Sequence, residues 1–283
     1  MKIVYFDTST YNKIVEHQKH KPIIEMFNKA IESGIFEIIF SPLNFEEFSH
    51  TSQVDIRTQL FELAYSICSN KFFIGHKEIL RKELGAFLKG TSLDRKDLYC
   101  MGNDLKNTLQ KAIEGSLFKD IPSDPFKEMK NRKHDYLLFE KKSKKELAPL
   151  WTRYNNIECE EFYKKTLQNI QGKAMLKDIC IRTLGDEINE DALLEIEINL
   201  GKLPGLRFLF KYICASIYNP LLRNKKCKWG SGIDMNHSVF IGHSDVFVTS
   251  DDDFSDIVRS FKEPQTDCLS LNDFINKYIQ VNK

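Results

Sequence analysis

Two short apolar segments at opposite ends of the chain each run into aspartate, and this pairing constrains the fold most. Residues 2–6 are followed by Asp7 and two hydroxyl residues, and residues 246–249 lead into three aspartates at positions 251 to 253. Open parallel sheets bind ligands just outside the carboxyl ends of their strands, so two such strands would gather carboxylates at one edge. Gathered carboxylates raise one another's pKa unless a hard cation supplies positive charge. The two ends therefore predict a Mg²⁺ or Mn²⁺ site with oxygen ligands.

The first 55 residues alternate between strand and helix patterns. A buried strand is predicted at residues 2–6, a helix at 11–33 that stops at Gly34, and a second strand at 36–40. Ser41 and Pro42 then form the cap and first-turn proline of another helix. After residue 229 the pattern returns, with a helix at 234–242, a strand at 246–249, a short helix at 254–257, a strand near 268–271 and a closing helix at 272–279. Such alternation is typical of an α/β fold with a parallel sheet.

The middle of the chain has a different pattern. From about residue 55 the apolar spacings are helical, and the one strand candidate is residues 71–74. We therefore expect a discontinuous core of residues 1–55 and 229–283, whose central parallel sheet is formed by both chain ends, and a mainly helical insertion at 56–228. Insertions of this size extend from a sheet at modest entropic cost.

Composition sets limits on the class of protein. The chain has 283 residues, 42% hydrophobic and 29% charged, which is ordinary for a globular protein. Lys plus Arg number 41 against 40 for Asp plus Glu, so any nucleic-acid contact must come from local patches. Seven scattered cysteines without a C-x-x-C pair indicate reduced thiols. Because we find no leader pattern and no apolar run long enough to span a membrane, we expect a cytoplasmic protein.

Four acidic residues have a reason to converge on the predicted sheet edge. Asp7 and Asp251 follow strands, and Asp234 lies on the helix before the strand that delivers Asp251. On the helix after Pro42 the candidates are Glu46 and Glu47, whose side chains point about 100° apart, so only one can easily face the site. Residue spacing alone leaves both open.

This arrangement resembles the PIN-domain family of metal-dependent nucleases. Residues 4–9 resemble the family's apolar strand followed by Asp, Thr and Ser or Asn, and residues 41–48 resemble the helix that brings its second acid, which favours Glu47 over Glu46. Residues 234–254 match the family's most recognisable block, an Asp-bearing helix that leads into Val-Thr-x-Asp-x-Asp-Phe. The likeness covers about the first and last 50 residues, and the chain departs from compact members by its long middle segment.

The resemblance implies a three-layer α/β/α domain and hydrolysis of phosphodiester bonds, with RNA as the expected substrate. One or two Mg²⁺ or Mn²⁺ ions would be held by catalytic residues Asp7, Glu47, Asp234 and Asp251 and would generate the nucleophile. The accessory residues are Ser9, Thr249 and Asp253, whereas Asp252 should be solvated. The helical insertion would control access or recruit a regulatory protein, as in a toxin and antitoxin pair. The alternative is a catalytically degenerate PIN-like fold that acts as a protein-interaction or sensor scaffold.

Other residue groups are weaker candidates. A basic run just before Asp234 is the natural place for phosphate contacts, and it contains Arg223, Lys225, Lys226 and Lys228. A second basic run lies at 139–145. His237 and His243 are six residues apart, which does not place them on one helix face, so we expect ordinary structural roles, with a position near the rim of the site as the alternative. A haloacid-dehalogenase-like phosphatase would need an aspartate two residues after Asp7, where this chain has Ser9.

Overall fold

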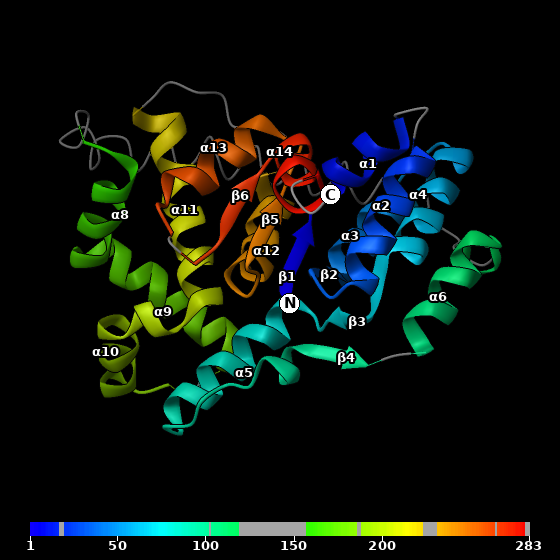
Figure 1. Cartoon of the computed structure of the whole chain (residues 1–283). Coiled ribbons are helices and arrows are strands. Elements are labelled where there is room, and N and C mark those ends of the chain that lie inside the picture. Colours follow the sequence, from blue (N-terminus) through cyan, green and yellow to red (C-terminus); the bar gives the residue numbers. More distant parts are fainter. Residues whose placement is uncertain are drawn as a thin grey trace.

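The computed structural model describes residues 1–16, 20–101, 103–118, 157–185, 188–222, 231–263 and 265–280. Six strands form one sheet in the order β4-β3-β2-β1-β5-β6, and all neighbours are parallel except β3 and β4 (Figure 1). The strands are β1 (Lys2–Phe6), β2 (Phe36–Phe40), β3 (Cys68–Phe73), β4 (Tyr99–Met101), β5 (Val246–Val248) and β6 (Asp267–Leu269).

The central strands are buried on both sides and are apolar except for Lys2 and for Glu37 of β2, which pairs with Lys71. Every residue of β2 and β5 is buried, as is every residue of β1 after Lys2. A strand covered on both faces needs a continuous apolar run rather than an alternating one. The aromatic and β-branched residues of these strands meet that need and suit the pleated backbone.

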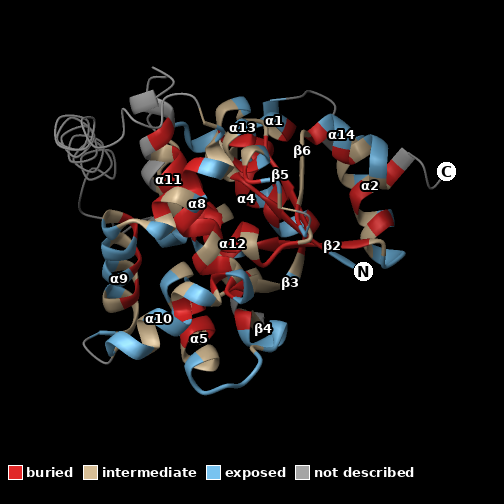
Figure 2. Cartoon of the chain, turned by 90° about the vertical axis from the view of Figure 1, so that its left-hand side faces the viewer, coloured by how far each residue is buried: buried red, intermediate tan, exposed pale blue. Residues whose placement is uncertain are grey.

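Helices cover both faces of the sheet, and each layer has its own hydrophobic core (Figures 1 and 2). On the face of Val4 and Phe6 lie α1 (Thr8–Glu16), α2 (His20–Glu32), α4 (Val54–Ile67), α6 (Asn103–Ile113) and α14 (Leu271–Ile275), which continues as a π-helical turn, Asn276–Gln280. On the face of Tyr5 lie α5 (His76–Leu88), α11 (Pro204–Leu222), α12 (Ser231–Gly242) and α13 (Asp252–Ser260). Farther from the sheet, α8 (Cys159–Gln168) packs against α11, α9 (Ile170–Leu184) against α8 and α5, and α10 (Glu190–Ile198) against α9. The short α3 (Pro42–Ser49) contributes to both cores. The α/β class and the mainly parallel sheet are thus confirmed.

The sheet extends beyond the two chain ends, which corrects one expectation. β3 and β4 come from residues 68–101, inside the predicted insertion, yet they continue the sheet next to β2. The boundary at residue 55 therefore does not coincide with an edge of the sheet. A second difference is that the helix expected at 11–33 is two helices, α1 and α2.

Helix α12, which carries Asp234, is held at its carboxyl end by the start of α11. A Cβ atom added to Gly242 would lie 2.5 Å from the carbonyl oxygen of Pro204, so only glycine allows this approach. The buried Glu83 of α5 accepts hydrogen bonds of 2.9 Å from the amides of Gly205 and Leu206 at the start of α11. A carboxylate is stabilised there by the unpaired amides and the helix dipole. Helices α5, α11 and α12 thus form one layer against the sheet.

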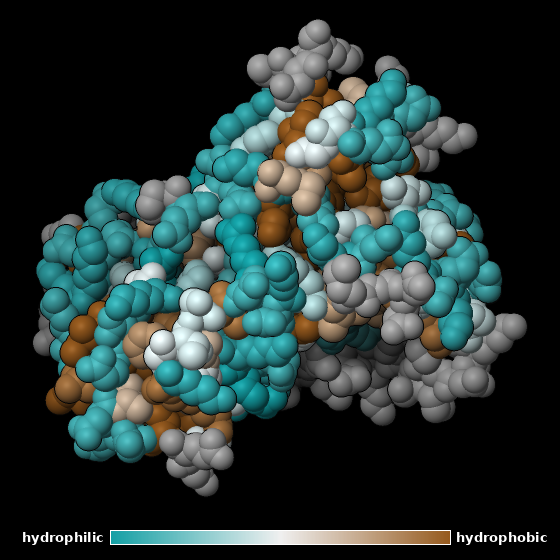
Figure 3. All heavy atoms as spheres, turned by 60° about the horizontal axis from the view of Figure 1, so that its bottom comes forward, coloured by the Kyte–Doolittle hydropathy of each residue, from teal (hydrophilic) through white to brown (hydrophobic). Residues whose placement is uncertain are grey.

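The surface carries some apolar side chains on the outer helices. Ile170 of α9 is 83% exposed, and Leu194 and Ile198 of α10 are 52% and 68% exposed. Figure 3 shows hydrophobic surface on the side where Figure 1 places α8 to α10. None of the helices in the described ranges combines the length and apolar character that a membrane crossing requires.

Replacement of Gly242 by alanine tests the close approach of α11 and α12. The new Cβ would overlap the backbone of Pro204, so we expect the free energy of unfolding to fall by about 1–3 kcal/mol, as measured by urea unfolding. Gly85→Ala in α5 is the matched control, because its Cβ would meet nothing within 4 Å. That change should be neutral or stabilise by up to about 1 kcal/mol. Equal stability of the two variants would contradict the packing described.

Candidate active site

Asp7 lies at the carboxyl end of β1, where β1 and β5 run side by side. β2 and β3 extend the sheet from one side of β1 while β5 and β6 extend it from the other, so the topological switch point lies between β1 and β5. The register pairs Phe6 with Val248, which places Asp7 next to Thr249. Ligands of open α/β sheets bind in the crevice at such a point. The predicted edge is therefore the edge at which the two strand ends meet.

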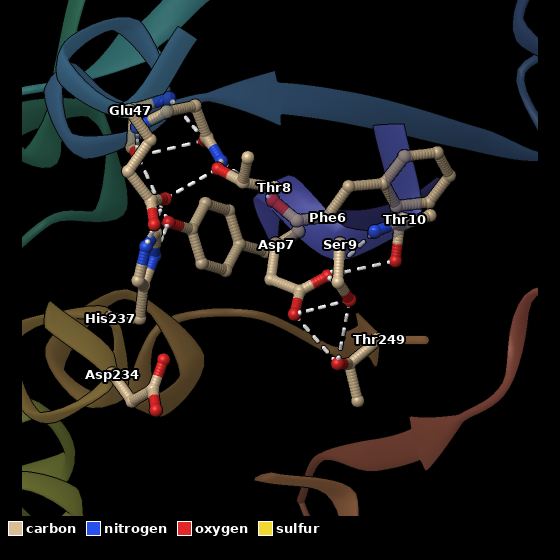
Figure 4. Close-up of polar contacts among 12 residues, drawn as sticks. Phe6, Asp7, Thr8, Ser9, Thr10, Glu47, Asp234, His237 and Thr249 are labelled. Carbon is tan, nitrogen blue, oxygen red and sulfur yellow. Dashed lines mark hydrogen bonds and ion pairs between the residues drawn. The ribbon is translucent and has the colours of Figure 1, made fainter. Parts of the chain in front are cut away.

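Hydroxyl and amide donors surround the Asp7 carboxylate (Figure 4). Thr249 Oγ1 donates to Asp7 Oδ2 at 2.6 Å, and Ser9 Oγ lies 2.8 Å from both carboxylate oxygens. The amide and hydroxyl of Thr10 donate to Oδ1 at 3.0 and 2.9 Å. Burial raises the pKa of Asp7 above its ordinary value, and the hydrogen bonds from Thr249, Ser9 and Thr10 counter part of this rise. The accessory residues Ser9 and Thr249 thus contact the acid that they were expected to orient.

Glu47, rather than Glu46, turns toward the site, where its carboxylate contacts Thr8 and His237. Its helix begins at the cap Ser41, whose side chain accepts from the Asn44 amide while the Asn44 side chain accepts from the Ser41 amide. From α3, Glu47 Oε2 accepts a hydrogen bond from Thr8 Oγ1 and lies 2.9 Å from His237 Nε2. Glu46 lies instead near His76, and its charge partly opposes the lowering of the His76 pKa that burial causes.

Asp234 stands in the first turn of α12, beside His237 in Figure 4. Tyr212 of α11 donates to its Oδ2 at 3.4 Å. Burial raises the pKa of Asp234 to about 7; His237 opposes this rise, whereas the carboxylates of Glu47, Asp7 and Asp251 add to it. The charges of the other three acids therefore reach Asp234, which burial, with their repulsion added, leaves partly protonated near neutral pH.

Asp251 caps helix α13 at the end of the segment that follows β5. Its Oδ1 accepts from the amides of Asp253 and Phe254 at 2.9 and 3.0 Å, and its own amide donates to Thr249 Oγ1 at 3.0 Å. Aspartate is a preferred helix cap, so this residue has a structural role besides its place among the acids. Asp252 is exposed, as expected for a solvated residue, and Asp253 is half-buried.

His237 belongs to the site, which the spacing of the two histidines did not indicate. It is 1% exposed and pairs with Glu47, whereas His243 is buried at the far end of α12 beside Glu83. Burial alone would lower the pKa of His237, but Glu47, through its charge and its hydrogen bond, raises it above its ordinary value together with Asp234 and Asp7. The available signal was the spacing of three residues from Asp234, which places both side chains on one face of α12.

A second imidazole lies near this group. His76 is the first residue of α5, shortly after β3, and therefore stands at the same edge of the parallel strands as Asp7. Burial lowers its pKa to about 4, with Lys77 and His237 adding to the effect. His76 is thus neutral at pH 7.

The donor set fits a hard divalent cation by its chemistry, because it consists of carboxylate oxygens. Within the described residues no donor contacts Glu47 Oε1 or Asp251 Oδ2, so each of these carboxylates keeps an oxygen for a ligand. The described part of the chain contains no group of three or more His, Cys, Asp or Glu side chains already placed to hold a metal ion.

The basic residues expected to contact phosphate cannot be placed in this site. Arg223, Lys225, Lys226 and Lys228 lie outside the described residues, as does the basic run at 139–145.

No family model, curated protein or solved structure matches this chain. The likeness to PIN-domain nucleases accordingly rests on the residue pattern alone, and the contacts above are the further support for a function.

The pKa of Asp234 predicts a pH-dependent stability difference between the wild type and Asp234→Asn. A raised carboxyl pKa means that the folded state binds the proton more tightly, so wild-type stability falls as pH rises from about 4 to about 7. Asparagine does not ionise, so the stability of the variant does not fall with pH for this reason. In EDTA, we expect the variant to gain about 2 kcal/mol over the wild type between pH 4 and pH 8, after allowance for solvent screening. Chemical unfolding at both pH values checks this, and a constant difference would contradict it.

Proposed function

We propose that this protein is a PIN-like, metal-dependent endonuclease that hydrolyses phosphodiester bonds in RNA. The observation that carries the proposal is the convergence of carboxylates from four elements on one sheet edge. Asp7 follows β1, Glu47 comes from α3, Asp234 from α12 and Asp251 from the end of the β5 segment.

Charge explains why such a site calls for a metal. Buried carboxylates repel one another and would repel the phosphate of a substrate, whereas a bound divalent cation reverses the sign of the site. Burial raises the pKa of Asp234 to about 7, and the charges of Glu47, Asp7 and Asp251 add to this rise. Clefts that perturb the pKa of several acids in this way are candidates for catalysis.

In the proposed mechanism, Asp7, Glu47, Asp234 and Asp251 would hold Mg²⁺ or Mn²⁺. The bound ion would supply a hydroxide nucleophile and neutralise charge on the scissile phosphate. Ser9 and Thr249 hold the Asp7 carboxylate in place by hydrogen bonds.

Two contacts orient the remaining acids. Tyr212 of α11 donates to Asp234, so a helix of the middle segment contributes to the site. The backbone amides of α13 fix one oxygen of Asp251. Asp253 remains an accessory acid in this proposal.

Substrate, partner and location belong to the same proposal. The choice of RNA over DNA follows the resemblance to PIN-domain nucleases, and Arg223, Lys225, Lys226 and Lys228 are the proposed phosphate contacts. A regulatory protein would bind the helices of the middle segment, where Ile170, Leu194 and Ile198 are exposed. We propose a cytoplasmic location, because reduced cysteines like those expected of this chain persist there and RNA substrates are present.

Cleavage of single-stranded RNA with Mn²⁺ tests the metal-site acids. Asp7→Asn and Asp251→Asn should each lower the rate by at least 100-fold, because removing a group that holds the metal costs several kcal/mol of transition-state stabilisation. Asparagine also caps helices well, so Asp251→Asn should keep α13 intact. Asp252→Asn is the control, because Asp252 is the exposed neighbour of Asp251. This variant should cleave RNA as fast as the wild type.

Equal activity of the wild type and all three variants would remove the metal-site claim. Absence of cleavage by the wild type on single-stranded RNA and DNA alike would instead favour the scaffold alternative.

Manganese should also stabilise the folded protein. At a concentration of 100 times the dissociation constant, ligand binding to the native state adds about 2.7 kcal/mol. A thermal shift assay should show a rise of several degrees for the wild type and none for Asp7→Asn. An unchanged melting temperature of the wild type at millimolar Mn²⁺ would contradict the claim that the folded protein binds this metal.

A further inference from the structure

Glu47 is joined to the interior of the protein by a continuous chain of buried hydrogen bonds. The chain runs through His237, Tyr5, Ser41 and Asn44, whose side chains are at most 1% exposed. It links α12, β1 and α3, so it crosses three of the elements that deliver the acids. Figure 4 shows its outer end, where Glu47 and His237 face each other above Asp234.

The direction of these hydrogen bonds can be worked out from the inner end. Asn44 Nδ2 lies 3.1 Å from the carbonyl oxygen of Phe6, which can only accept, so this atom is the amide nitrogen. Asn44 Oδ1 therefore accepts, both from the Ser41 amide at 3.2 Å and from Ser41 Oγ at 2.8 Å. The single hydroxyl proton of Ser41 is thus committed to Asn44.

The outer half of the chain follows from that commitment. Because Ser41 Oγ has no second proton, it accepts from Tyr5 Oη at 2.9 Å. Tyr5 Oη in turn has given its only proton, so it accepts from His237 Nδ1. His237 Nε2 lies 2.9 Å from the Glu47 carboxylate, which can only accept. Both ring nitrogens of His237 therefore donate.

We propose that His237 is a positioning residue that fixes Glu47 Oε2 at the acid cluster through this chain, and so presents Oε1 to the metal. The inference rests on the proposed function, because it specifies how one of the four metal-holding acids is oriented. His237 touches neither the metal nor the substrate in this account. Partners that orient a metal ligand typically change metal affinity or activity by roughly 10- to 100-fold when they are removed.

Two substitutions of His237 separate its contacts. The amide nitrogen of asparagine matches the position of Nδ1, so His237→Asn keeps a donor for Tyr5 and loses the one for Glu47. The longer His237→Gln places its amide nitrogen where Nε2 stands and keeps the donor for Glu47. We expect His237→Asn to weaken Mn²⁺ binding, measured by calorimetry, and to lower kcat by roughly 10- to 100-fold each, with KM for RNA unchanged. His237→Gln should rescue most of both losses.

A double-mutant cycle shows whether His237 acts through Glu47. Glu47→Gln alone should weaken Mn²⁺ binding, and adding His237→Asn to it should cost nothing further, because residues that act through one contact are not additive. Tyr5→Phe is a second probe, since it removes one hydroxyl but keeps a ring that packs against Phe73, Phe240 and Phe247. It should weaken Mn²⁺ binding less than His237→Asn does.

The outcomes distinguish this inference from the proposed function. If Asp7→Asn abolishes Mn²⁺ binding and cleavage while His237→Asn and Tyr5→Phe match the wild type, the nuclease stands and the positioning role is overturned. Additive losses in the cycle with Glu47→Gln would overturn it too. If the wild type neither binds Mn²⁺ nor cleaves RNA, the proposed function fails and the inference fails with it. Should His237→Asn not fold, Tyr5→Phe and His237→Gln decide by the same measurements.

Discussion

The parallel pairing of β1 with β5 is the contact on which the rest of the site depends. The Asp7 amide donates to the carbonyl of Val248, and the Asp245 amide donates to the carbonyl of Ile3, so the two strands are locked in one register. A slip by one residue would turn every side chain to the other face of the sheet. The hydrogen bond from Thr249 to Asp7, and with it the place of Asp251, is a product of this register.

The four acids differ in how the protein compensates for their burial. Asp7 accepts hydrogen bonds from hydroxyls, Asp251 accepts them from helix amides, and Glu47 lies against the imidazole of His237. Among the residues that the structure describes, Asp234 accepts one hydrogen bond, from a tyrosine at 3.4 Å, and burial raises its pKa to about 7. Hydrogen bonds stabilise the ionised form of a carboxyl group, and a single long one opposes this rise only weakly.

Much of the fold could be predicted because the relevant signals are local. The apolar runs at 2–6, 36–40 and 246–249, the cap at Ser41 and the helix that bears Asp234 all appear as expected. β3 was harder because its middle carries Ser69, Asn70 and Lys71, polar residues that a strand near the sheet edge tolerates. The role of His237 depends on Glu47, 190 positions away, and no spacing along the chain reports such a contact. Sequence pattern indicated the acids and the hydroxyls of Ser9 and Thr249, but not the contact between His237 and Glu47.

The closure of the sheet by its last strands has a consequence for how the protein is made. Asp7 and Thr249 are 242 positions apart, so their contact forms only after all the residues between them have been synthesised. A growing polypeptide that ends before α12 already carries Asp7 and Glu47 but has neither Asp234 nor Asp251. Long-range pairing of this kind also folds slowly, because loop closure precedes the contacts that reward it. The acid cluster therefore cannot assemble before the segment that carries Asp234 and Asp251 has been synthesised.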